Sequence, residues 1–459
     1  MIIGGGPGGY EAALVAAQLG GQVSIVDTDG LGGSAVLTDC VPSKTLIAVA
    51  EVVTMAAESG DLGVRIHGEA PLPGVVHVDL AVVNARVKHL AAAQSHDIAL
   101  SMQRAGVRVV RGRGRVESRE RVVVDLPDGG TEVLSAATVL IATGASPRIV
   151  AGAEPDGERI LSWDQVYDLP ELPSKLIVVG SGVTGAEFAS AYNALGSEVV
   201  LVSSRDRVLP GEDADAAAVL EDVFTRRGMQ VLSRARASVV ERTTDGVRVV
   251  LQDGRVVEGS HCLMAVGSVP NTANLGLDEA GVHLDEGGYI VTDRVSRTSV
   301  RGIYAAGDCT GVLMLASTAA MQGRIAMRHA MGDAVVPLDL KAVSANVFTD
   351  PEIATVGWTQ TDVDAGLIEA MSVHLPLATN ARAKMVGLDD GFVKLFCRPG
   401  TGIVVGGVVV APKASELIFP IAIAVDQRLT VDQLANSFTV YPSLSGSIAE
   451  AARRLHLHS

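Results

Sequence analysis

Two copies of one short pattern constrain the fold of this 459-residue chain more than any other feature. Residues 2–9 read as an apolar strand, then Gly-x-Gly-x-x-Gly, then the start of a helical pattern, and residues 176–185 repeat that order. In such a unit the glycines permit the turn and let backbone N–H groups approach a pyrophosphate at the helix N-terminus. One match is weak evidence in a glycine-rich chain, but two matches in the same context predict two dinucleotide sites. The glycines are Gly4, Gly6, Gly9, Gly180, Gly182 and Gly185.

The two copies also end alike, which indicates that the repeat covers whole domains. Residues 139–147 and 263–270 are each an apolar strand followed by a glycine-containing turn and a proline. We expect both exits to lie beside their cofactor. The residues concerned are Ala142, Thr143, Gly144 and Gly267.

The residue that ends the second strand of each copy indicates which nucleotide is bound. A carboxylate about 20 residues beyond the glycines contacts the ribose in such units. Asp27 fills that place in the first copy, whereas the second has Ser203, Ser204 and Arg205, with Arg207 nearby. Hydroxyl and guanidinium groups suit a 2′-phosphate, so the second site should accept NADPH as well as NADH. In the alternative interpretation, both arginines are ordinary solvated loop charges.

Length and composition favour an α/β protein of several domains. A chain of 459 residues exceeds what one hydrophobic core usually serves, and its apolar content of 48% comes mainly from aliphatic residues, because aromatics contribute 3%. Helical periodicity predicts a long helix over residues 80–105, and apolar runs predict strands over 392–397 and 403–411.

The net charge of −15 argues against nucleic acid as a partner, since that would require clustered lysine and arginine. No apolar run approaches the roughly 20 residues of a membrane span, so we expect no membrane span. No charged leader precedes the first glycine motif, which favours the cytoplasm; Met1 to Ile3 also make a short first strand, so the start codon could lie upstream.

Four cysteines lack the spacing of metal ligands, and we expect no metal site. Cys262, Cys309 and Cys397 lie in or beside apolar strands and are expected in the core. Cys40 has a more informative context, within residues 32–44.

Three long motifs resemble the pyridine nucleotide-disulfide oxidoreductases, the family of dihydrolipoamide dehydrogenase and glutathione reductase. They span residues 32–44, 302–308 and 348–357. The resemblance implies an α/β fold with two Rossmann-like nucleotide-binding domains and an α+β dimerisation domain. It implies an FAD domain over 1–150 and 271–335, an NAD(P) domain over 151–270 and an interface domain over 336–459, in a homodimer.

The same resemblance implies roles for individual residues. Lys44 would reach the N5 edge of the flavin and pair with Glu187 near the nicotinamide; without the family, the two would be read as an ordinary partly exposed ion pair. Cys40 would lie closest to the flavin ring, either as a charge-donating thiolate or as an inert cysteine. Further residues at the FAD site would be Gly33, Asp308, Leu315, Ala316 and Ser317.

The chain departs from the family where the disulfide chemistry takes place. The family has a C-x4-C pair, but here Ala35 stands at the first position and Cys40 at the second. The family's C-terminal histidine base and its carboxylate are replaced by Tyr441 and Gly446. The nearby His456 and His458 are expected to belong to a frayed tail rather than to supply the base. Thiol-disulfide exchange needs an attacking and a resolving thiol, so disulfide reduction is not expected.

These observations predict an FAD-dependent enzyme that passes electrons from NAD(P)H to a quinone. Some thiol-deficient members of the family reduce quinones, and a planar diffusible acceptor needs no thiol relay. Two alternatives remain open at this point: a single-cysteine peroxide or CoA-disulfide reductase that uses Cys40, and a non-catalytic flavin- and nucleotide-binding redox sensor.

Overall fold

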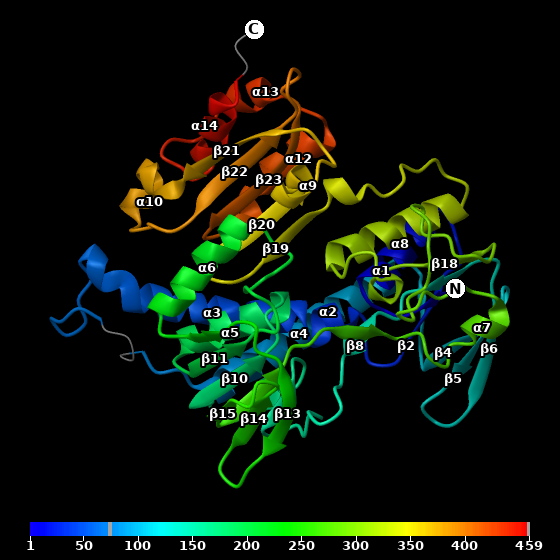
Figure 1. Cartoon of the computed structure of the whole chain (residues 1–459). Coiled ribbons are helices and arrows are strands. Elements are labelled where there is room, and N and C mark those ends of the chain that lie inside the picture. The colour runs from blue at the N-terminus through cyan, green and yellow to red at the C-terminus, as the bar shows by residue number, and fades with distance from the viewer. Residues whose placement is uncertain (72–75, 457–459) are drawn as a thin grey trace. The chain divides into compact units, whose positions relative to one another are not determined.

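The computed structural model describes residues 1–71 and 76–456, which divide into two compact units. Unit 1 comprises residues 1–45, 84–148 and 267–339, and unit 2 comprises the other described residues. Helices α3 and α4 pass from one unit to the other. Figure 1 labels the elements along the chain.

The elements of unit 1, with α3 and α4, are β1 (Ile2–Ile3), α1 (Pro7–Gln18), β2 (Ser24–Asp27), α2 (Gly33–Leu37), α3 (Cys40–Glu58), α4 (Leu80–Arg104), β3 (Arg108–Arg111), β4 (Arg113–Ser118), β5 (Arg121–Asp125), β6 (Thr131–Ser135), β7 (Val139–Ile141), β8 (Ala145–Pro147), β17 (Ser268–Pro270), α7 (Leu277–Ala280), β18 (Ile303–Ala305), the 3₁₀ turn η3 (Asp308–Thr310) and α8 (Ala316–Ala330).

The elements of unit 2 are η1 (Ser59–Leu62), β9 (Ile160–Ser162), η2 (Val166–Asp168), β10 (Lys175–Val179), α5 (Val183–Leu195), β11 (Glu198–Val202), α6 (Ala214–Arg226), β12 (Gln230–Leu232), β13 (Ala237–Arg242), β14 (Val247–Leu251), β15 (Val256–Gly259), β16 (His261–Met264), η4 (Leu340–Ala342), β19 (Ser344–Val347), β20 (Glu352–Gly357), α9 (Gln360–Asp364), β21 (Met371–Pro376), η5 (Leu377–Thr379), α10 (Ala381–Met385), β22 (Phe392–Cys397), β23 (Val404–Ala411), α11 (Ala414–Leu417), α12 (Phe419–Asp426), α13 (Val431–Ala435) and α14 (Gly446–Arg454).

A five-stranded parallel sheet with the order β18-β7-β1-β2-β3 forms the centre of unit 1. Its central strands are apolar because both faces are covered. One core cluster joins the sheet to α1, α4 and α8, and a second joins it to the antiparallel sheet β4-β5-β6. This layering places the turn after β1 at the carboxyl edge of the sheet.

Unit 2 repeats this architecture with a parallel sheet in the order β12-β11-β10-β16-β9 and an antiparallel sheet β13-β14-β15. Helix α5 packs on β10 and β11, as α1 packs on β1 and β2. The predicted repeat of whole strand-turn-helix modules is therefore confirmed. Helix α1 begins at Pro7 and helix α5 at Val183, inside the two glycine motifs rather than after them.

A third sheet in unit 2 is antiparallel, with the order β19-β20-β23-β22-β21. Helices α11 to α14 contribute to its apolar core, and α12 and α14 are drawn beside its strands in Figure 1. Every residue of β22 and β23 is buried, which confirms the two strands predicted from apolar runs. The long helix predicted over 80–105 is also confirmed as α4.

One helical stretch, residues 33–62, is long and apolar enough to cross a membrane by length and composition alone. It is not an uninterrupted apolar run, because it includes Asp39, Lys44 and Glu51. Core helices of soluble proteins pass the same test, and this stretch is interrupted between α2 and α3. Glu51 within it forms an ion pair with Lys413 at 2.7 Å, so the stretch packs against other residues of unit 2.

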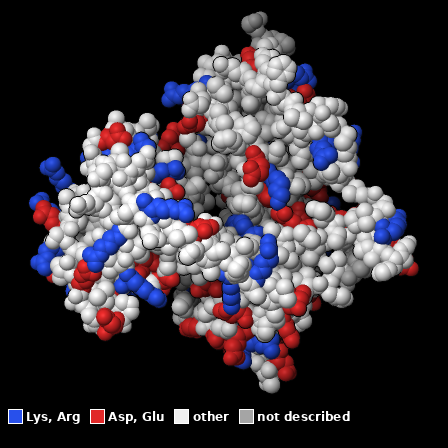
Figure 2. All heavy atoms as spheres, turned by 180° about the vertical axis from the view of Figure 1, so that it is seen from behind, with Lys and Arg blue, Asp and Glu red and all other residues white. Residues whose placement is uncertain are grey.

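Acidic and basic side chains are interspersed over the face of the molecule shown in Figure 2. The exposed ion pairs of the molecule include Arg108–Glu132 and Arg226–Asp390.

Candidate active site

The first glycine turn is tightly packed at the carboxyl edge of the unit 1 sheet. A Cβ atom on Gly4 would lie 2.2 Å from the carbonyl oxygen of Ala142, and one on Gly9 would lie 1.9 Å from that of Gly4. Gly6 is the N-cap of α1, and no side chain caps the helix there. The first N–H groups of α1 can therefore bind an anion, as a pyrophosphate site requires.

Asp27 joins this turn to the end of β2. Its carboxylate accepts hydrogen bonds from the backbone N–H groups of Gly5 at 2.6 Å, Asp29 at 3.0 Å and Gly30 at 2.7 Å. Burial raises the pKa of Asp27, and the three N–H groups only partly offset this. The structure thus brings Asp27 and the first glycines together, as the sequence predicts.

The other predicted residues of the FAD site also lie in unit 1. Gly33 faces Gly6, since a Cβ on Gly33 would lie 2.8 Å from the Cα of Gly6. Thr143 donates a hydrogen bond to the carbonyl of Asn271 at 2.7 Å, and the N–H of Asn271 donates to Gly144 at 3.0 Å. These contacts fix the exit from β7 beside the glycine turn.

Asp308 lies at the start of η3, two residues after the sheet-facing Ala306. Burial, reinforced by the negative charge of Asp39, raises the pKa of Asp308 to about 6. A partly buried carboxylate of this kind is stabilised by hydroxyl donors. Leu315 is the N-cap of α8, and Ala316 and Ser317 open that helix, which packs along α1 through Gly8 and Ala319.

The second glycine turn has nearly the same geometry as the first. A Cβ on Gly180 would lie 2.1 Å from the carbonyl oxygen of Ala265, and one on Gly185 would lie 1.9 Å from that of Gly180. Gly182 is the N-cap of α5, again without a side-chain cap. Gly267 belongs to unit 1 by contact, so only Gly180, Gly182 and Gly185 are assembled within unit 2.

Ser203 differs in exposure from the next two residues, Ser204 and Arg205. It is fully buried, its Oγ lies 2.7 Å from the Oγ of Ser181, and it accepts a hydrogen bond from the N–H of Arg205 at 3.1 Å. Ser203 follows the last residue of β11, and its hydroxyl is engaged in hydrogen bonds within the protein. Ser204 and Arg205 are exposed, whereas the guanidinium of Arg207 donates to the carbonyls of Pro210 and Glu212.

Glu187 is almost completely buried on α5. Its carboxylate accepts a hydrogen bond from the N–H of Phe348 at 2.9 Å, and one helical turn later Ser190 accepts one from the N–H of Asp350 at 3.2 Å. Lys44 lies one turn into α3, in unit 1. Its pairing with Glu187, in unit 2, stays a prediction.

Cys40 is a partly buried thiol at the first position of α3. Ala35 lies in α2 and offers no sulfur for a disulfide. Cys262 and Cys309 are deeply buried, and burial raises the pKa of Cys309 to about 11 and that of Cys262 still further. Cys397 is buried within β22.

The two C-terminal residues that stand in place of the family's base and carboxylate are not histidines. Tyr441 is largely exposed, and Gly446 begins α14. His456 forms an ion pair with Asp432 when it is protonated, and His458 lies outside the described residues. Among residues 1–71 and 76–456, no group of three or more His, Cys, Asp or Glu residues could hold a metal ion.

Comparisons with known proteins agree with this geometry. The sequence pattern described as pyridine nucleotide-disulphide oxidoreductase matches residues 1–323, and its dimerisation domain matches residues 343–452. The chain belongs to the pyridine nucleotide-disulphide oxidoreductase family.

Individual relatives of this family cover the whole chain. It is 56% identical to an NAD(P)H dehydrogenase (quinone) of Mycobacterium tuberculosis over 100% of this chain and 94% of that protein. It is 35% identical to dihydrolipoyl dehydrogenase 2 of Haloarcula marismortui, over 98% and 95% of the two chains. The crystal structure of LpdA from Mycobacterium tuberculosis superposes with a TM-score of 0.94, at 56% identity and 99% coverage of both chains.

The family uses FAD and NAD(P)H, and the residues of unit 1 fit FAD. Gly4, Gly9 and Gly33 have no Cβ atom, so the backbone at these positions can approach a ligand closely. The N-terminus of α1, which no side chain caps, lies at the same turn. The partly buried carboxyl group of Asp308 is of a kind that fits a hydroxyl donor. The protein is an oxidoreductase of this family, with an α/β fold and a dimerisation domain.

Sequence reasoning missed Gln322. This buried residue of α8 accepts a hydrogen bond from the N–H of Gly307 at 2.8 Å and donates one to Thr310 at 3.3 Å, so it holds the turn that carries Asp308. No motif marks it. A signal was nonetheless present, because Gln322 is a long polar side chain among buried residues of α8 that are mostly apolar.

Proposed function

We propose that the protein is an NAD(P)H:quinone oxidoreductase that works through FAD, without disulfide reductase or dihydrolipoamide dehydrogenase activity. One observation carries the proposal: Ala35 stands where a disulfide with Cys40 would need a second sulfur. Electrons that reach the flavin then have no thiol relay to follow. The 56% identity to a protein named NAD(P)H dehydrogenase (quinone) supports the same acceptor.

The domains follow from this proposal. Residues 1–150 and 271–335 would bind FAD through the first glycine turn, Asp27, Gly33, residues 142–144, Asp308 and residues 315–317. Residues 151–270 would bind NADPH or NADH through Gly180, Gly182, Gly185, Ser204 and Arg205, with Gly267 at the exit. Bound FAD would supply the chemistry that links hydride transfer from the nicotinamide to electron transfer to the acceptor.

Lys44 and Glu187 would be the catalytic pair. The ammonium group of Lys44 would stabilise negative charge that develops beside it during hydride transfer. Glu187 would hold Lys44, and the N–H of Phe348 supports this role because it fixes the carboxylate in the buried wall of α5. Cys40 would lie near the flavin without forming a covalent intermediate.

Residues 336–459 would form the interface of a homodimer. The match to the family's dimerisation domain over residues 343–452 supports this, and exposed apolar side chains lie in the same region. We propose a cytoplasmic location, with a small-molecule quinone as the partner that takes the electrons.

The test is the quinone-dependent oxidation of NADPH by the wild type, Cys40→Ser and Lys44→Ala, assayed side by side. Cys40→Ser should keep most of the activity, because no thiol takes part. Lys44→Ala should lower kcat/KM by a factor that corresponds to a loss of about 2 to 4 kcal/mol of transition-state stabilisation, because it removes the cation that stabilises the developing negative charge.

The control is lipoamide, which neither the wild type nor Ala35→Cys should reduce, because Tyr441 and Gly446 supply no base. Loss of quinone turnover in Cys40→Ser with flavin still bound would contradict the proposal and favour the single-cysteine reductase. Flavin that stays oxidised under anaerobic NADPH would favour the redox sensor.

A further inference from the structure

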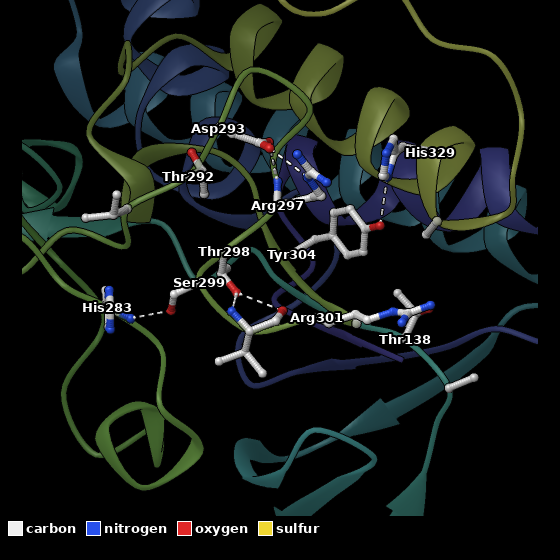
Figure 3. A pocket seen from close by; sticks show the side chains of 15 residues that line it. Thr138, His283, Thr292, Asp293, Arg297, Thr298, Ser299, Arg301, Tyr304 and His329 are labelled. Atoms are coloured by element: carbon white, nitrogen blue, oxygen red, sulfur yellow. Dashed lines mark hydrogen bonds and ion pairs between the residues drawn. The ribbon is translucent and has the colours of Figure 1, made fainter.

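A cavity of about 840 Å³ opens in unit 1, and no residue assigned above lines it. Its walls are the residues just before β7, the residues just before β18, the segment 291–301 and the end of α8 (Figure 3). The strands β1, β7 and β18 are parallel, and the glycine turn follows β1 at their carboxyl ends. The cavity therefore lies at the opposite, amino edge of the same sheet.

The length of α8 shows how far the cavity lies from the proposed FAD site. Its first residue follows the predicted flavin-side residue Leu315, and His329 lies in its last turn at the cavity. Fourteen residue steps of helix correspond to about 20 Å. The cavity is therefore distinct from the proposed FAD site.

His329 is held in a defined orientation at the cavity wall. The hydroxyl of the buried Tyr304 lies 2.9 Å from Nδ1 of His329, and the two rings are 5.9 Å apart (Figure 3). We assign the hydroxyl as the donor, because a phenol donates readily to a neutral imidazole nitrogen. The proton of the ring then lies on Nε2, which becomes a hydrogen-bond donor on the far side of the ring.

The charges at the cavity have a positive balance. Asp293 accepts hydrogen bonds from the N–H groups of Val295 and Arg297 and from Nε of Arg297, the last at 2.7 Å. Burial raises the pKa of Asp293, but its hydrogen bonds to Arg297 outweigh this and hold the carboxyl below its ordinary pKa. Asp293 is thus charged and neutralised by Arg297.

Arg301 is the second guanidinium group of the lining and is exposed. Within the part of the chain that the structure describes, its side chain has no carboxylate partner. Apolar wall is provided by Ala137, Val291, Val300 and Ala330. The lining therefore offers a guanidinium group, an imidazole and aliphatic groups to a bound molecule.

We propose that this cavity binds a small organic anion with a phosphate or carboxylate group, which Arg301 and Nε2 of His329 recognise. A guanidinium and an imidazole N–H are both donors that match anionic oxygens. A concave site strengthens their effect because its walls exclude part of the surrounding water. The site does not depend on the redox function proposed above.

Equilibrium dialysis of the FAD-loaded protein tests this site, with radiolabelled pyrophosphate in one arm and citrate in the other. Excess NAD⁺ fills the nucleotide site in both arms. We expect one bound anion per chain for at least one probe. Arg301→Ala and His329→Gln should each weaken that binding by about tenfold or more, because each removes a donor to the charged group.

The matched control is Arg328→Ala. Arg328 precedes His329 in α8, does not line the cavity and pairs instead with Asp333 at 3.5 Å. It should bind the anion within about twofold of the wild type. Arg301 is exposed, so its variant reports on binding even if His329→Gln alters packing around Tyr304.

Two results would overturn the proposal. One is that neither probe binds once NAD⁺ is present, because any earlier signal then came from the nucleotide site. The other is equal affinity in the wild type and Arg301→Ala. Binding of pyrophosphate alone identifies a phosphate site, and binding of citrate alone identifies a carboxylate site.

Discussion

At the scale of single residues, Arg205 is the side chain that should decide between the two nicotinamide cofactors. It is exposed at the end of β11, whereas the neighbouring Ser203 is buried and hydrogen-bonded to Ser181. A guanidinium group there would pair with the 2′-phosphate that only NADPH carries. Arg205→Ala should therefore lower kcat/KM for NADPH by a factor that corresponds to about 1 to 3 kcal/mol, and it should leave kcat/KM for NADH nearly unchanged. Steady-state kinetics with both cofactors measures this.

Arg207→Ala is the matched control, because that guanidinium already donates to the carbonyls of Pro210 and Glu212. It should affect both cofactors alike. An equal loss for NADPH and NADH in Arg205→Ala would show that the 2′-phosphate lies elsewhere. Ser203→Glu is a poorer test of cofactor choice, since it would place a carboxylate in a fully buried position.

At the scale of elements, a buried lysine joins α6 to β22. The ammonium group of Lys394 lies 2.9 Å from Asp213, which caps the N-terminus of α6, and 2.8 Å from Asp215. Removal of one partner from a buried ion pair leaves an uncompensated charge. Lys394→Ala should therefore destabilise the protein by about 3 to 5 kcal/mol, measured as a lower midpoint of urea denaturation.

Lys413→Ala is the comparison for this element, because Lys413 forms an exposed pair with Glu51 and should cost about 1 kcal/mol or less. The double variant Lys394→Met with Asp213→Asn should be more stable than Lys394→Ala, because no buried charge then remains unpaired there. A midpoint for Lys394→Ala as high as that of Lys413→Ala would contradict the interpretation.

At the scale of the whole molecule, exposed apolar side chains mark the surface by which two chains would associate. They lie on α12 and in the segment after α13, within the matched dimerisation domain, at Phe419, Ile423, Phe438, Val440 and Tyr441. Exposed apolar area of this kind favours association. Phe438→Asp should therefore shift the protein from a dimer toward a 47.4 kDa monomer in sedimentation velocity.

The control is Ile149→Asp, because Ile149 is also exposed but lies outside residues 336–459. That variant should sediment like the wild type. If the wild type is a monomer at micromolar concentration, the proposed interface is wrong.

The sequence alone determined the features that depend on local backbone chemistry. Glycines at Gly4 and Gly180 predict close backbone turns, because a Cβ atom there would collide with a carbonyl oxygen. Apolar runs predict β22 and β23, because strands buried on both faces have no polar alternation. The absence of a sulfur at Ala35 is likewise a property of the sequence.

Only the tertiary structure decided which side chains face each other across long stretches of chain. It buries Ser203 against Ser181, pairs Lys394 with Asp213, and places Gln322 on the turn before Asp308. It also brings Arg301 and His329 to one cavity at the amino edge of a sheet. These contacts join residues that periodicity and motif spacing treat as independent, because they depend on how distant elements pack.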